Sequence, residues 1–322
     1  MRTLSNGLKI ILNSVSIFFR WPKLIFPLFL TWIFYALSVL YLKYFYLWGH
    51  YSFLQNFLVS FSFIILLSIF ICFSSSWLLE MLQDIEKHRD VFFVDTFKRV
   101  FIENFINILP IAIIWAFLWF TLSVINFFLR KKDKNSDEYL TAQSAAETLA
   151  GVEDFSLSNL FIEALQKGIR MIVFLIMPAI AWENLGTFTA IKKGILVFRM
   201  RLRQFTVGYA LTYAASGIIF IPVVVMFKLG TKGKHGSPPL VDFSEYAWIG
   251  LIVYVGLAWS FVLYLEQMFT ASLYLWHLNW EKLCSEAKDK NETPPDFYSV
   301  HPPHLFSTLP ELREFYGIRQ PD

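Results

Sequence analysis

The chain has 322 residues, of which 56% are hydrophobic and only 16% are charged, and its net charge is +3 at neutral pH. Soluble domains carry about 25% charged residues, and this chain also contains 35 phenylalanines and 11 tryptophans. A soluble fold could not bury that much aromatic surface. The composition therefore excludes an ordinary soluble domain and predicts an all-α integral membrane protein.

Six apolar runs of the sequence are predicted to form transmembrane helices, because a core about 30 Å thick requires about 20 apolar residues. The fourth run is short and is expected to extend through its flanks, whereas the sixth exceeds the bilayer thickness and should tilt or protrude. Together they define a membrane domain over residues 1–280. The predicted spans are residues 24–47, 53–79, 108–129, 169–184, 205–227 and 247–276.

Three basic, amphipathic segments each precede a pair of predicted spans. They cover residues 3–20, 92–108 and 187–204, and their apolar residues recur at helical spacing, which is typical of helices lying at a membrane surface. The repeated order of surface helix and spanning hairpin indicates an internal three-fold repeat. Chance similarity among three amphipathic segments is the alternative.

The distribution of lysine and arginine predicts the orientation. With a cytoplasmic N-terminus, most of the 28 basic residues fall on the cytoplasmic side, in agreement with the positive-inside rule. The polar connection 130–158 is then a flexible extracytoplasmic loop, and residues 281–322 are a cytoplasmic tail. The basic group at 130–134 runs against this orientation.

Several motifs resemble a group of uncharacterised bacterial six-helix inner-membrane proteins. One is the pattern P-x4-E-N-x-G-x3-A-x-K-x-G; two others are FTASLYLWHL at 269–278 and the opening SNGLKIILNS followed by RWPKLIFPLF. The group includes the membrane domain associated with glycerophosphodiester phosphodiesterases, and it usually has glycine after the glutamate. The resemblance implies a six-helix scaffold in the bacterial inner membrane, without a phosphodiesterase domain. The residues that carry the first pattern are Pro178, Glu183, Asn184, Gly186, Ala190, Lys192 and Gly194.

Two glutamates in apolar surroundings are candidate functional residues. Glu183 closes the fourth predicted span and is expected to hydrogen-bond backbone amides at the start of the next helix, where the helix dipole favours negative charge. Glu266 lies inside the sixth span, where a carboxylate is costly and normally has a partner. A structural pair or an interfacial position is one interpretation of Glu266, and a role in proton or substrate binding is the other.

A basic cluster after the fourth span is predicted to contact lipid headgroups. Its setting between two membrane runs favours anionic lipid over nucleic acid, with about 1 kcal/mol from each cation near the surface. Positive-inside anchoring alone is the simpler interpretation. The cluster consists of Lys192, Lys193, Arg199, Arg201 and Arg203.

The sequence favours a non-enzymatic membrane protein, a scaffold or lipid-homeostasis factor that binds lipid. A small transporter or channel for a lipid or hydrophobic solute is the alternative, using Glu266 and spans broken at Pro178 and Pro222. Such a transporter predicts a polar-lined cavity, and a scaffold predicts an apolar interior. No cofactor or metal site is predicted. The tail 291–322, in which residues 297–316 alternate apolar residues with prolines, is a candidate docking segment for a protein partner, and a solvated tail is the alternative.

Overall fold

A computed structural model describes residues 2–86, 93–133, 157–230 and 244–301. These ranges are helical apart from short connections, and six helices in them are long and apolar enough to cross a membrane. The prediction of an all-α protein with six candidate spans is therefore confirmed. The candidate spans are Pro22–Tyr44, Leu54–Ile85, Phe93–Asn126, Ala164–Ala181, Leu202–Met226 and Ile249–Asp289.

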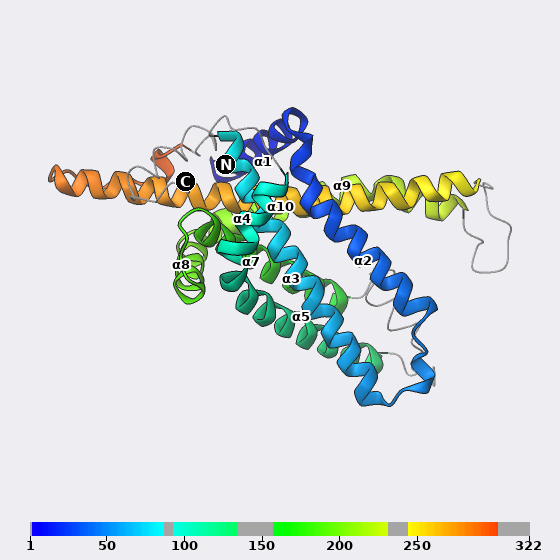
Figure 1. The fold of residues 1–322 in the computed structure, drawn as a ribbon. Helices are drawn as coiled ribbons and strands as arrows, with labels where there is room; N and C mark the ends of the chain where they lie inside the picture. Colours follow the sequence, from blue (N-terminus) through cyan, green and yellow to red (C-terminus); the bar gives the residue numbers. More distant parts are fainter. Residues whose placement is uncertain (1, 87–92, 134–156, 231–243, 302–322) are drawn as a thin grey trace.

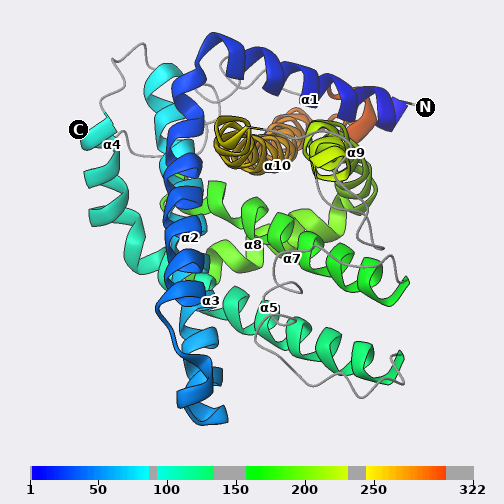
Figure 2. The same cartoon turned by 90° about the vertical axis from the view of Figure 1, so that its right-hand side faces the viewer.

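The long helices form three pairs, α2 with α3, α5 with α7, and α9 with α10, whose outer ends lie apart (Figures 1 and 2), while α3 also packs closely against α5. The shorter helices α1, α4 and α8 each precede one pair. The bounds are α1 Arg2–Arg20, α2 Phe26–Tyr44, α3 Phe53–Glu86, α4 Phe93–Arg99, α5 Phe105–Asp133, α7 Leu157–Ala181, α8 Thr187–Met200, α9 Leu202–Gly230 and α10 Glu245–Asp289. Short 3₁₀ turns cover Pro22–Ile25, Trp48–His50 and Phe297–Ser299, and a π-helical turn covers Val100–Asn104.

The second helices of the pairs form the packed centre of the molecule. Helix α7 packs against both α3 and α10, and most of the buried apolar core comes from residues 67–85, 171–182 and 263–278. Large apolar side chains are instead exposed along residues 37–47, 54–66, 113–125, 213–225 and 246–257. Exposed apolar surface on this scale is typical of helices that contact lipid, in agreement with a multi-pass membrane protein.

Helices α4 and α8 each pack against the pair of long helices that comes before them in the chain. Helix α1, which is the first element, packs against the last pair, so the order of contacts is cyclic. Helix α4 lies on α3, α8 lies on α7, and α1 lies on α9 and α10. Close approach explains two glycines: a Cβ on Gly7 would lie 2.9 Å from Val207, and one on Gly194 would lie 2.5 Å from Ile176. Small residues at these points let a surface helix lie directly on the helix beneath it.

Several predicted boundaries are wrong. Helix α8 ends at Met200 and α9 begins at Leu202, so the predicted surface helix 187–204 is two helices. Helix α4, the π-helical turn and α5 follow without a break, and α10 continues to Asp289, so the predicted tail begins inside a helix. Helical propensity continues past the apolar runs that defined the predicted spans.

The two proline positions do not break their helices. Pro178 lies in the last turn of α7, three residues before its end, and Pro222 lies inside α9. A proline removes one backbone hydrogen bond, which neighbouring packing and local adjustment can tolerate in a membrane helix. The connection between α5 and α7 beyond Asp133, and the tail beyond residue 301, lie outside the described residues.

Candidate functional site

Glu266 is the centre of a buried group of charges between α7 and α10. Its side chain is fully buried, and it accepts two hydrogen bonds from Arg170, from Nε at 2.8 Å and from Nη2 at 2.9 Å. Lys167 Nζ lies 3.3 Å from the same carboxylate and sits over the rings of Tyr209 and Tyr213 at 5.2 and 5.0 Å. Glu266 therefore has two cationic partners and is enclosed by protein.

A polar junction of three helices lies next to this group. Gln267 of α10 accepts a hydrogen bond from the Ser75 hydroxyl of α3 and donates one to the Phe174 carbonyl of α7 at 3.3 Å. All three residues are fully buried. The interior is therefore not wholly apolar, unlike the interior that the scaffold interpretation predicts, and hydrogen bonds and ion pairs across the central helices satisfy these buried polar groups.

Sequence analysis does not pair Lys167 and Arg170 with Glu266. Lys167 lies just before the predicted fourth span and Arg170 lies at its start. Their spacing of three residues places them on one face of a helix, and this was the available signal. Only packing brings that face of α7 to the middle of α10.

Glu183 does not cap α8. The N-cap of α8 is Gly186, without a side-chain hydrogen bond, and the Glu183 carboxylate instead lies 2.5 Å from Lys193 Nζ and accepts a hydrogen bond from the Tyr274 hydroxyl. The cationic side chain on α8 offers a stronger partner than the backbone amides. The pair fixes α8 against the end of α7 and against α10.

The α3–α4 joint carries an ion pair of the same kind. Asp84, near the end of α3, lies 2.5 Å from Arg99 at the end of α4. Next to it, Asn104 of the π-helical turn donates to the buried Glu80 at 3.4 Å, and Trp77 donates to Thr96 at 2.9 Å. At both joints, an acidic residue at the end of a central helix binds a basic residue of the short helix that follows.

The predicted lipid-contact cluster separates into three environments. Lys192, Arg199 and Arg203 are exposed, Lys193 is held by Glu183, and Arg201 is 7% exposed. The sequence placed all five on one surface helix, but Arg201 lies between α8 and α9 and Arg203 belongs to α9. Three of the five cations are therefore available at the surface.

Arg201 is enclosed by the end of α10 and the start of the tail. Its guanidinium lies 3.4 Å from the ring centre of Phe297 and 4.3 Å from that of Trp280, and its Nε donates to Nδ1 of the buried His277 at 3.3 Å. Trp280 also donates to the Pro295 carbonyl at 3.0 Å. Cation–π contact and hydrogen bonds thus hold residues 295–300 against their own chain.

We expect Phe297→Ala to release this part of the tail. The substitution removes a 4%-exposed ring that contacts Arg201, so the backbone amides of residues 292–301 should exchange hydrogen about tenfold faster or more. Hydrogen-exchange mass spectrometry of the purified protein measures this. Phe188→Ala is the matched control, because Phe188 is 75% exposed and should leave the exchange unchanged; equal rates in both variants would show that the ring does not hold the tail.

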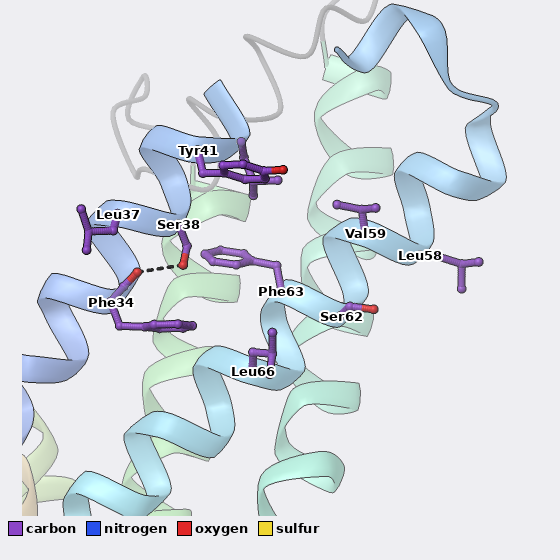
Figure 3. A pocket seen from close by; sticks show the side chains of 10 residues that line it. Phe34, Leu37, Ser38, Tyr41, Leu58, Val59, Ser62, Phe63 and Leu66 are labelled. Carbon is purple, nitrogen blue, oxygen red and sulfur yellow. Dashed lines mark hydrogen bonds between the residues drawn. The ribbon is translucent and has the colours of Figure 1, made fainter. Parts of the chain in front are cut away.

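An apolar cleft of about 610 Å³ lies between α2 and α3. Phe34, Ser38 and Tyr41 of α2 face Phe63 and Val59 of α3 across it (Figure 3). The Ser38 hydroxyl is occupied, because it donates to the Phe34 carbonyl at 2.8 Å. The cleft contains none of the charged candidates, so its chemistry suits a hydrocarbon chain rather than an ion.

Among the described residues, no three His, Cys, Asp or Glu side chains lie close enough together to hold a metal ion. Comparison of the chain with protein-family models, with curated proteins and with solved structures found no significant match.

Proposed function

We propose that this chain is a non-enzymatic multi-pass membrane protein that binds phospholipid through its short surface helices. The observation that carries the proposal is the exposed face of α8. Lys192 and Arg199 lie there between the exposed apolar side chains of Phe188, Ile195 and Leu196. Interleaved apolar and basic residues suit the boundary between headgroups and acyl chains, since the apolar groups enter the membrane while long cations reach the phosphates.

Helix α1 supports the same position at a membrane surface. Leu4, Leu8 and Leu12 form an exposed row at a spacing of four residues, and the exposed Lys9 lies beside it. The opposite face packs on the protein through Ile10 and Ile17. In a helix lying at a membrane surface, the buried face would contact the protein, the exposed apolar row would contact lipid and the polar edge would contact water.

The cyclic packing of α1, α4 and α8 and the two matching ion pairs support a three-fold repeat of surface helix and spanning pair. In the proposed orientation, these helices and both termini are cytoplasmic, as the distribution of basic residues favours. The resemblance to bacterial six-helix proteins suggests the inner membrane. We propose a scaffold or lipid-homeostasis role on this basis, and the tail 291–322 stays the candidate contact for a protein partner.

The experiment measures binding of the purified protein to phosphatidylglycerol by native mass spectrometry. The triple variant Lys192→Gln, Arg199→Gln, Arg203→Gln should bind about fivefold more weakly for each cation that contacts a headgroup, since each contributes about 1 kcal/mol. The matched control is Lys43→Gln, Lys288→Gln, Lys290→Gln, which removes three exposed cations elsewhere. Equal loss in both variants would mean that net charge, and not the α8 surface, sets the affinity.

The alternative is a small lipid transporter that uses Glu266. Its supporting observation is a buried carboxylate within a candidate span, which marks a functional position in many membrane proteins. Transport would require Glu266 to change partners during the cycle. A Glu266→Gln variant with unaltered lipid movement between vesicle leaflets would remove this alternative.

A further inference from the structure

Arg170 uses only part of its hydrogen-bonding capacity on Glu266. A guanidinium has five N–H groups, and the two bonds to the carboxylate come from Nε and one N–H of Nη2. Within the described residues, Arg170 contacts no other acceptor. Three N–H groups, including both on Nη1, therefore point away from the ion pair.

Arg170 is the most exposed of the three charged residues in this group, and none of its nitrogens is among the described buried atoms that lack a hydrogen-bond partner. The Arg170 side chain is 25% exposed, whereas that of Glu266 is fully buried and that of Lys167 is 8% exposed. Arg170 lies in the candidate span Ala164–Ala181, where Leu165 is 41% exposed. A cationic side chain on a membrane helix normally extends to the headgroup level or binds a polar partner.

A phosphate group meets the requirements of the unused N–H groups of Arg170. Guanidinium and phosphate form paired, charge-assisted hydrogen bonds, and basic pockets between membrane helices bind anionic headgroups. Lys167 adds a second cation next to Arg170, because both contact the same carboxylate. Tyr213, under the Lys167 ammonium and 45% exposed, has the amphipathic ring that is common at the headgroup level.

We propose that the outer edge of Arg170, next to Lys167 and Tyr213, binds the phosphate group of a membrane phospholipid. Glu266 positions the guanidinium by holding Nε and Nη2, so that the remaining N–H groups are directed outward. The site lies on α7 and is separate from the exposed cations of α8. It rests on the proposed function only in naming phospholipid as the ligand.

Native mass spectrometry of the full chain tests the proposal with phosphatidylglycerol, with diacylglycerol, which lacks the phosphate, and with inorganic phosphate. Arg170→Lys keeps a charge for Glu266 but loses the outer fork, and we expect about tenfold weaker binding of phosphatidylglycerol at one site. Diacylglycerol should bind equally to both proteins. Unchanged phosphatidylglycerol binding would overturn the proposal, and displacement of the lipid by millimolar inorganic phosphate would overturn its assignment to a lipid.

The charge-free variant Lys167→Gln, Arg170→Gln, Glu266→Gln separates binding from folding, because it removes all three charges of the buried group. If these charges only join α7 to α10, the charge-free variant should keep its lipid affinity, whereas the proposal requires this variant to lack the site. The α8 triple variant Lys192→Gln, Arg199→Gln, Arg203→Gln distinguishes the Arg170 site from the lipid contacts of α8. It should retain the Arg170 site, so loss of the α8 contacts and loss of the Arg170 site are measured independently.

Discussion

Replacement of Glu266 by leucine is expected to lower the unfolding free energy of the membrane domain by about 3–5 kcal/mol. The carboxylate is fully buried between Arg170 and Lys167, and its removal leaves two cations facing each other without the charge that joins them. Removing one partner of a buried ion pair is far more harmful than replacing the whole pair, because the remaining charge cannot regain its hydration. Thermal unfolding in detergent, followed by tryptophan fluorescence, measures the loss.

Glu286→Leu is the matched control for this prediction. Glu286 also lies on α10, but its side chain is 40% exposed and its carboxylate is 4.0 Å from Lys282. Exposed pairs of this kind contribute about 0–1 kcal/mol. A melting temperature of Glu266→Leu within the range of the control would show that the buried charges do not stabilise the contact of α7 with α10.

A substitution at Gly208 of α9 is expected to have the second large effect on stability. A Cβ on Gly208 would overlap the ring of Phe269, which is 1% exposed in the core of α10. Gly208→Ala must therefore push α9 and α10 apart or displace the ring, and overpacking of this kind costs about 1–3 kcal/mol or more. The expected result is a lower thermal midpoint of the purified protein.

Gly217 of the same helix is the control, because a Cβ there meets nothing within 4 Å. Alanine at this position should be neutral or stabilising by up to about 1 kcal/mol, the difference in helix propensity between glycine and alanine. The two substitutions add the same methyl group to one helix. If both variants melted alike, the close contact of Gly208 with Phe269 would not govern the packing of α9 on α10.

Glu266 and Glu183 show which features of a buried carboxylate can be predicted from the sequence and which cannot. The sequence identified Glu266 as an intramembrane carboxylate that requires a partner, because the cost of a charge among apolar neighbours is a local property. It did not identify Arg170, which is 96 residues away along the chain. For Glu183 the sequence predicts contacts with the nearest helix start, but its partners are Lys193 and Tyr274, and Tyr274 lies on α10, far along the chain.

The sequence by itself determined the all-helical class and the six candidate spans, because hydrophobic length and the need to satisfy every backbone group in lipid act within one segment. It also located the basic segments that contain the short helices α1, α4 and α8. Only the tertiary structure decided which of their cations remain exposed: Lys192 does, whereas Arg201 is buried under Phe297. Exposure and ion pairing depend on which helix faces pack together, and that is set by contacts between segments far apart in the chain.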